Sequence, residues 1–303
     1  MRKRRGVLAA VAIVLAGQAP AAAAGGVQQD PPSWGLDRID QRTGLDHAYR
    51  YGDDAAGVTI YVIDSGVDAQ HPDFQGRVAP GRDFLGGGTD TADTNGHGTR
   101  LAGIAAGQAY GVAKGAQIVP VRVLDSGGGG ATEEIIAGLD WVAQNARQPA
   151  VAVLGIGGVP NDQLDAAVKR LATVLPIAVP AGSETADASG FSPGRVSEAL
   201  TVGAIDDQDH PDKASNFGQD IDLYAPGVAV PSPIAGGTTA GPESGTSVAA
   251  AFAAGAAAIY LAQHPGSTPA QVDQALVRAA TPDALKGVPE GTANRLLYVP
   301  PAS

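Results

Sequence analysis

The sequence contains no cysteine, and large sulfur and aromatic side chains are rare, with one Met, two Trp and five Phe. The absence of cysteine excludes disulfide bonds, thiolate metal sites and a cysteine nucleophile. The hydrophobic core therefore has to be built mainly from Ala, Val, Leu and Ile. The chain has 303 residues, 44% of them hydrophobic, which is enough for one large globular domain or two small ones.

Basic residues are scarce relative to acidic ones. The chain has 20 Lys and Arg against 31 Asp and Glu, for a formal net charge of −11. Four of the basic residues lie at positions 2–5, and without them the charge is −15. Binding to nucleic acid requires clustered positive charge, so this composition argues against a nucleic-acid partner.

Hydrophobic runs long enough to span a bilayer are also missing from the N-terminal region. The apolar run at positions 7–16 is too short, but it follows a basic start and precedes small residues up to Ala24. This pattern predicts a secretory signal peptide at 1–24 and a secreted, extracellular protein that contacts a membrane only if the signal is retained. Residues 25–32 are expected to form a short polar lead, which leaves no room for a prodomain.

The remainder of the chain alternates between two hydrophobic patterns. Continuous β-branched runs predict buried strands, and the segments between these strands contain stretches that predict helices. The predicted strands are 57–63, 117–124, 151–158, 176–183, 199–205 and 221–227, and the predicted helices begin near 96, 132, 162, 246 and 268. This alternation indicates an α/β fold with a mostly parallel central sheet and helices on both faces. No linker or repeat divides residues 33–303, so we expect them to form one domain.

The helix predicted near the C-terminus has no charged residue between Val248 and Ala262. A helix that is apolar on every face lies inside a protein. Ser247 falls in its first turn, where free backbone N–H groups and the helix dipole stabilise a developing oxyanion. Taken alone, Thr246 or Ser247 could equally be a helix cap.

Two further residues lie at positions where active sites are common, one at the end of a strand and one at the start of a helix. Asp64 ends the first strand, and in open parallel sheets the carboxyl ends of the strands form the ligand-binding edge. His97 lies in the motif GHGT at the start of a helix of small residues. Asp64 before Ser-Gly could instead be a turn residue. His71, beside Pro72 in a polar loop, is expected to be solvated or structural and serves as a comparison.

Asp64, His97 and Ser247 together supply the groups of a nucleophilic triad. A serine hydroxyl needs a base to take its proton, an imidazole is such a base near neutral pH, and a carboxylate orients the imidazole. The surrounding motifs resemble those of the subtilisin-like serine proteases, and most closely the proteinase K-like branch. They are WGLDRI, VIDSGVDAQHPDF, NGHGT with LAGIAAG, YGVAKGAQIVPVRVLD, FSPG, TVGAIDD and SGTS.

The resemblance covers nearly all of residues 33–303 and implies the roles of several residues. The three residues match the family's triad, with a protein or peptide as substrate and a monomer as the expected state. Two glycine-rich segments match the edges between which a peptide docks as an added strand, since glycine permits close backbone approach. The residues concerned are Gly127, Gly128, Gly155, Ile156 and Gly157. Both segments could also be flexible loops.

The sequence departs from the family's pattern at two supporting positions. Ser183, in PAGS, stands where the family usually has the asparagine of the oxyanion hole, so we count it among the catalytic residues. A serine hydroxyl can donate a hydrogen bond, but it is shorter and rotates freely. Ala251 stands where the family usually has a proline, four residues after the nucleophile. Without the proline, the helix could be straighter and Ser247 could be slightly shifted.

The resemblance also implies a possible structural calcium ion and no required cofactor. Asp222, with backbone carbonyls near Ser197 and Ala199, matches a calcium site of the proteinase K-like branch. Oxygen ligands from a carboxylate and from carbonyls suit Ca²⁺. An acidic residue at a strand end is an equally good interpretation of Asp222.

We therefore expect a secreted serine endopeptidase that acts through an acyl-enzyme and is weakened at the oxyanion hole. The alternative is an inactive or nearly inactive protein of the same fold that binds peptides or a cell-surface partner, favoured by Ser183, Ala251 and the expected lack of a prodomain. A nucleotide-binding α/β protein is disfavoured, because neither a G-x-G-x-x-G motif nor a P-loop follows any predicted strand.

Overall fold

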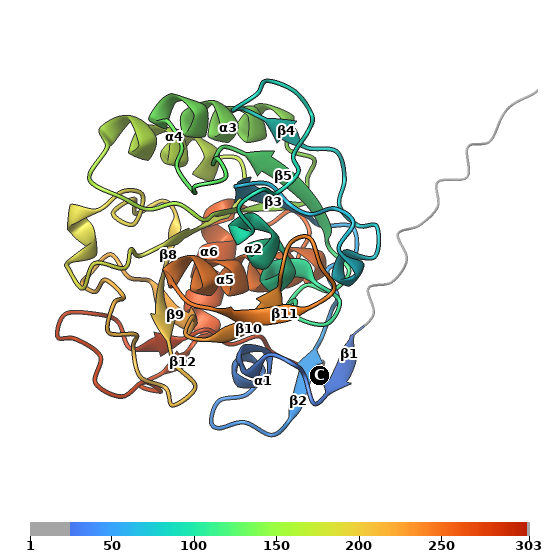
Figure 1. Ribbon diagram of the computed structural model, residues 1–303. Coiled ribbons are helices and arrows are strands. Elements are labelled where there is room, and N and C mark those ends of the chain that lie inside the picture. The colour runs from blue at the N-terminus through green and yellow to red at the C-terminus, as the bar shows by residue number, and fades with distance from the viewer. Residues whose placement is uncertain (1–24, 302–303) are drawn as a thin grey trace, which may run out of the picture.

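The computed structural model describes residues 25–301, and the predicted signal peptide at 1–24 lies outside the described residues. A nine-stranded sheet forms the centre of the molecule, in the order β12-β13-β9-β8-β7-β6-β3-β5-β4 (Figure 1). Every neighbouring pair from β13 to β4 is parallel, and only β12 is antiparallel to its neighbour. The predicted α/β fold with a mostly parallel sheet is confirmed.

The strands of this sheet are short, and the central strands β3, β6, β7, β8 and β9 are buried along their whole length. Their bounds are β3 Thr59–Asp64, β4 Arg82–Asp83, β5 Gln117–Arg122, β6 Ala150–Leu154, β7 Ile177–Pro180, β8 Leu200–Ile205, β9 Leu223–Pro226, β12 Thr281–Pro282 and β13 Arg295–Leu296. All six predicted strands are present. The predicted strands 151–158 and 176–183 end sooner than expected, which leaves their glycine-containing ends as loops at the carboxyl edge of the sheet.

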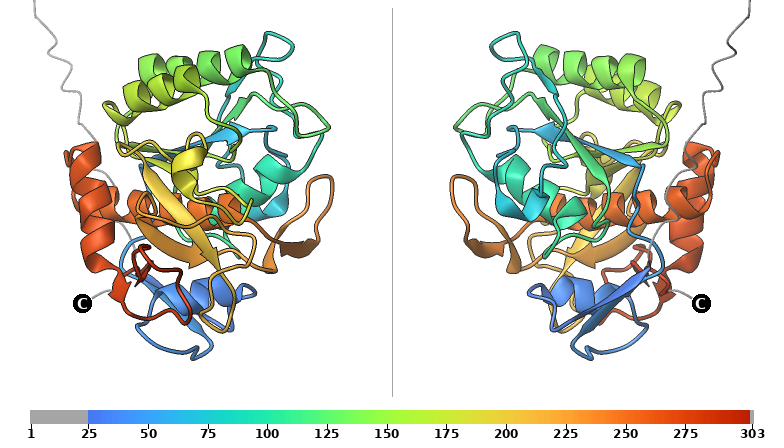
Figure 2. Two further views of the ribbon diagram at one scale, coloured as in Figure 1. Left: turned by 90° about the vertical axis from the view of Figure 1, so that its left-hand side faces the viewer. Right: turned by 90° about the vertical axis from the view of Figure 1, so that its right-hand side faces the viewer.

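Helices cover both faces of the sheet (Figure 1). On one face lie α3, Thr132–Asn145, and α4, Asp162–Ala172, packed over the side chains of Tyr61 and Ile63. On the other face lie α2, His97–Ala106, and α5, Thr246–Gln263, packed over Ile60 and Val62. Alternate residues of β3 thus point to opposite faces, as strand geometry requires. Helix α6, Pro269–Ala279, stands at the periphery beside the C-terminal segment (Figure 2).

Helix α5 forms the centre of the larger hydrophobic cluster, as its uncharged sequence predicts. It is long and apolar enough to cross a membrane by composition, but it is the buried core helix here. Small residues allow its close approach to α2: a Cβ atom added at Gly255 would lie 2.6 Å from Val112 Cβ and 2.8 Å from Ala105 O. The helix is continuous through the fully buried Ala251.

Several elements were not predicted from the sequence. Residues 25–32 were expected to form a polar lead, but they contain β1, Gly26–Gln29, which pairs antiparallel with β2, Ala48–Tyr51. Helix α1, Trp34–Ile39, by contrast agrees with the sequence of residues 31–52, which predicts an irregular arm with one or two helical turns. A hairpin of β10, Val230–Pro233, and β11, Ala240–Glu243, precedes α5.

Candidate active site

Asp64 lies at the carboxyl end of β3, between β5 and β6 in the middle of the sheet, and is completely buried. One of its carboxylate oxygens, Oδ1, accepts a hydrogen bond of 2.7 Å from the backbone N–H of Ser65. Burial of a carboxylate is costly unless it is hydrogen-bonded or paired. Both oxygens of this carboxylate also lie within hydrogen-bonding distance of the His97 ring.

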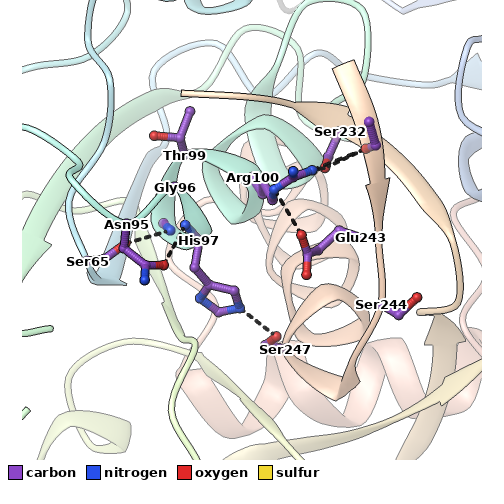
Figure 3. A network of polar contacts seen from close by, with 12 residues as sticks. Ser65, Asn95, Gly96, His97, Thr99, Arg100, Ser232, Glu243, Ser244 and Ser247 are labelled. Atoms are coloured by element: carbon purple, nitrogen blue, oxygen red, sulfur yellow. Dashed lines mark hydrogen bonds and ion pairs between the residues drawn. The ribbon is translucent and has the colours of Figure 1, made fainter. Parts of the chain in front are cut away.

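His97 is the first residue of α2, and its ring lies between Asp64 and Ser247. Its Nδ1 atom is 2.9 Å from each carboxylate oxygen of Asp64. Its Nε2 atom is 3.0 Å from Ser247 Oγ (Figure 3). Each distance falls within the range of a hydrogen bond. The structure thus brings together the three residues of the predicted triad, which are 33 and 150 positions apart in the sequence.

The start of α2 is fixed by the segment that precedes it. Gly96 has φ of +106°, in the left-handed region that favours glycine, and its N–H donates to Asp93 Oδ1 at 2.7 Å. The other oxygen of Asp93 accepts from the N–H of Thr99 at 2.8 Å. A Cβ atom at Gly98 would clash with the carbonyl oxygen of Gly66, so glycine permits the close approach of α2 to the loop after β3.

The pKa of His97 results from opposing effects. Burial on its own lowers the pKa, but the charge and hydrogen bond of Asp64, with smaller contributions from Glu243 and Asp93, raise it above the ordinary value of 6.5. An imidazole with this pKa is neutral above that value and can accept the serine proton. His71, by contrast, is buried far from this chemistry: its Nδ1 accepts from the N–H of Asp73 at the start of a 3-10 turn. It is structural and not solvated.

A cavity of about 250 Å³ adjoins Ser247. Its lining includes Gly155, Gly157, Ser183, Thr246 and Ser247. The hydroxyl of Ser183 is exposed and lies 3.4 Å from Thr246 Oγ1, which also accepts from the N–H of Gly182 at 3.2 Å. Ser183 therefore faces the space beside the serine, as its match to the oxyanion position implies. The sequence predicts Thr246 only as a possible helix cap, but in the structure its hydroxyl contacts that of Ser183.

The two glycine-rich segments differ in their relation to this cavity. Gly155 and Gly157 line it, and Ile156 between them is partly buried. A side chain at Gly155 would clash with Asp64, so the packing around Asp64 also requires a glycine at this position. Gly127 and Gly128 do not line the cavity. They are exposed in the loop after β5, and Gly127 N–H donates to Asp125 at 2.8 Å.

Asp222 lies in a separate cavity of about 460 Å³ that is also lined by Ser197, Ala199 and Asp273. Its Oδ2 atom accepts from Thr201 N–H at 2.8 Å. Burial raises the pKa of Asp222 to about 6, and burial with the charge of Asp222 raises the pKa of Asp273 to about 7. Asp273 Oδ1 is buried without a hydrogen-bond partner.

Carboxylate oxygens and carbonyl-bearing loop residues, which are suitable ligands for a hard cation, line this cavity, and Arg278 lines it as well. Within residues 25–301 no group of three or more His, Cys, Asp or Glu side chains is arranged to hold a metal ion. A cation beside Asp222 would therefore also need carbonyl or water oxygens as ligands.

Comparisons with known proteins agree with this architecture. The sequence profile of the subtilase family matches residues 55–295. The chain is 45% identical over 275 residues to an extracellular serine proteinase of Thermus sp. (strain Rt41A), covering 90% of this chain and 67% of the relative. It is 42% identical over 268 residues to alkaline serine exoprotease A of Vibrio alginolyticus, covering 88% of this chain and 50% of the relative.

A solved structure shows the same fold. The crystal structure of a cold-adapted subtilisin-like serine proteinase superposes with a TM-score of 0.86 at 43% identity, covering 88% of this chain and 97% of the other. The chain thus spans about two thirds of the Thermus relative and half of the Vibrio relative, but almost the whole of the solved structure.

The first prediction concerns the titration of His97. Because Asp64 raises the pKa of His97, Asp64→Asn should move the NMR titration of this imidazole to lower pH. Replacing the aspartate of a Ser-His-Asp triad with asparagine lowers kcat by about 10⁴-fold, so the residual activity of Asp64→Asn should be small. An unchanged or higher pKa of His97 in the variant would contradict the pairing of Asp64 with His97.

Proposed function

The chain belongs to the subtilase family, and from this premise we propose that it is a secreted serine endopeptidase that hydrolyses peptide bonds through an acyl-enzyme. The single observation that most supports this proposal is the continuous chain of contacts Asp64, His97, Ser247, with 2.9 Å and 3.0 Å between the interacting atoms. The proposed peptidase unit is residues 33–303, which act as a monomer on protein or peptide substrates, with no role for nucleic acid.

In the proposed mechanism Ser247 Oγ attacks the scissile carbonyl carbon while His97 Nε2 takes its proton. The protonated imidazole then donates this proton to the leaving amine, which leaves an ester on Ser247. A water molecule, deprotonated by His97, hydrolyses the ester in the second half of the reaction. Asp64 keeps the Nδ1 proton of His97 in place and stabilises the imidazolium, as the short distances to both carboxylate oxygens favour.

The oxyanion formed in these steps needs hydrogen-bond donors on the cavity side of Ser247. We propose the backbone N–H of Ser247 and the hydroxyl of Ser183 for this role, because Ser183 and Ser247 line the same cavity. The N-terminal end of α5 adds a favourable dipole. Gly155 to Gly157, and Gly127 with Gly128 opposite, are proposed to flank the bound peptide as edges of an added strand.

A non-catalytic peptide-binding protein is the second candidate function, and the replacement of the usual asparagine by Ser183 is the observation that favours it. Loss of one oxyanion donor costs about 2.7–4 kcal/mol of transition-state stabilisation, which slows a reaction about 10²- to 10³-fold without abolishing it. The intact geometry at Ser247 makes the enzyme the better supported function.

Labelling with a fluorophosphonate probe separates the two functions. The wild-type protein should be labelled, because the probe reacts with a serine whose proton is removed by a neighbouring base. Ser247→Ala should not be labelled, while the control Ser267→Ala, at the opposite end of α5, should be labelled like the wild type. Absence of labelling in the wild type, with the fold intact by circular dichroism, would favour the binding protein.

The role proposed for Ser183 can be tested in both directions. Ser183→Asn should raise kcat with little change in KM, because a longer amide donor acts mainly on the transition state. Ser183→Ala, which removes the hydroxyl, should lower kcat. The measurement is steady-state hydrolysis of a peptide p-nitroanilide. An unchanged or lower kcat in Ser183→Asn would count against the placement of Ser183 in the oxyanion hole.

We also propose that Asp222 takes part in binding a structural calcium ion, with backbone oxygens of Ser197 and Ala199 as further ligands. The support is the shared cavity and the buried carboxyls of Asp222 and Asp273. Such an ion would neutralise these carboxyls and stabilise the fold, and the proposed chemistry at Ser247 does not require it.

Thermal unfolding tests the calcium proposal. An ion that binds only the folded protein stabilises it by about 2.7 kcal/mol when its free concentration is a hundredfold above Kd, so CaCl₂ should raise Tm and a chelator should lower it. This difference should disappear in Asp222→Asn and persist in Asp207→Asn, an exposed control. An equal calcium effect in wild type and Asp222→Asn would exclude Asp222 as a ligand.

A further inference from the structure

Arg100 is one helical turn after His97 on α2 and is tied to the hairpin that precedes the serine. Its Nε atom is 2.9 Å from Glu243 Oε2, and its Nη1 atom donates to Ser232 Oγ at 3.1 Å and to the carbonyl of Gly241 at 3.2 Å (Figure 3). One guanidinium thus holds both strands of the β10–β11 hairpin. The sequence motifs gave no indication of this contact.

The position of Glu243 connects this contact to the nucleophile. Glu243 is the last residue of β11 and stands four positions before Ser247. The two residues between Glu243 and the start of α5 have their own anchors: Ser244 Oγ accepts from Ala229 N–H at 2.8 Å, and Gly245 N–H donates to the Gly227 carbonyl at 2.8 Å. Both anchors lie in the segment just before β10, so the hairpin and the start of α5 are held together as one unit, and Arg100 joins this unit to α2.

The contact between α2 and the hairpin is close as well as polar. A Cβ atom at Gly103, one turn after Arg100, would approach Pro233 of β10 too closely, so the two elements pack without space between them. The side chains of Arg100 and Glu243 are largely shielded, with exposed fractions of 19% and 27%. Shielding from solvent strengthens an ion pair relative to one on an open surface.

Three carboxylates from the elements around His97 act on its imidazole. Asp64 comes from β3, Asp93 from the loop before α2 and Glu243 from β11. The three carboxylates each raise the pKa of His97, against the effect of burial. Arg100 is the cation paired with Glu243, so it offsets part of the negative charge that Glu243 presents to the imidazole.

We propose that Arg100 and Glu243 form a positioning pair that holds the segment before Ser247 in register with the helix that carries His97, and that balances the charge at the imidazole. The geometric part rests on the proposed peptidase function, because it is read out in kcat. The electrostatic part does not, because it is measured on the histidine itself.

The electrostatic part predicts opposite effects from the two halves of one ion pair. Arg100→Gln leaves Glu243 unbalanced and should shift the NMR titration of His97 to higher pH, whereas Glu243→Gln leaves Arg100 unbalanced and should shift it to lower pH. The double variant should return toward the wild-type value. A matched control is Arg170→Gln, which breaks the ion pair of Arg170 with Asp140 between α4 and α3, 2.8 Å, and should shift nothing.

The geometric part predicts a loss of kcat with little change in KM. Arg100→Lys keeps the charge but cannot contact Glu243, Ser232 and Gly241 together, so His97 should titrate as in the wild type while kcat falls. A fall of up to about 10²-fold is the scale expected for a displaced reacting group. Thermal unfolding checks that each variant is folded.

The results for the Arg100 and Glu243 variants can be separated from a failure of the proposed peptidase function. If the protein proves inactive, opposite shifts in the two single variants still support the electrostatic role. Shifts in the same direction, or none, would overturn that role whatever the activity. Wild-type kcat in a folded Arg100→Lys, in an active enzyme, would overturn the geometric role.

Discussion

The close packing of α5 against α2 and against one face of the parallel sheet is the constraint on which the candidate site depends. These two helices carry Ser247 and His97 in their first turns, so the distance between the helices sets the distance between the hydroxyl and the imidazole. Small residues make this approach possible, as the lack of space at Gly255 shows. The alanine-rich composition of the core is therefore a condition for the chemistry as much as for stability.

The candidate site has a tightly held centre, the triad residues, and a loosely held residue, Ser183, at the rim of the adjoining cavity. Asp64 is fully buried at the end of a central strand, and its two carboxylate oxygens are held by Ser65 and His97. Ser183, in contrast, is exposed on a loop, and among residues 25–301 its hydroxyl makes one long contact, 3.4 Å to Thr246 Oγ1. The arrangement explains how a supporting group can differ from the family pattern while the central three residues keep their geometry. Under the proposed mechanism, changes at the rim should lower the rate moderately, whereas changes at the centre should lower it far more.

Much of this could be predicted from the sequence because the signals were local. An uninterrupted β-branched run ending at Asp64 identifies a buried strand, and an uncharged run after Ser247 identifies a buried helix. The short strands β1 and β2 could not be predicted in this way, since they pair with each other across residues 30–47, a connection that includes helix α1. The contact of Arg100 with Glu243 joins residues 143 positions apart, and neither residue belongs to a pattern that marks it. Sequence motifs identified candidate catalytic groups, but only the structure identifies what holds them in place.

The central claim is that His97 Nε2 takes the proton of Ser247 Oγ across a 3.0 Å contact while the serine oxygen attacks the substrate carbonyl carbon. A peptidyl chloromethyl ketone tests it most directly, because this reagent forms a hemiketal with the serine oxygen and alkylates the histidine nitrogen. The crystal structure of the treated protein should show one inhibitor molecule bonded both to Ser247 Oγ and to His97 Nε2. A protein that remains unmodified, or an adduct attached to any other pair of atoms, would contradict the account.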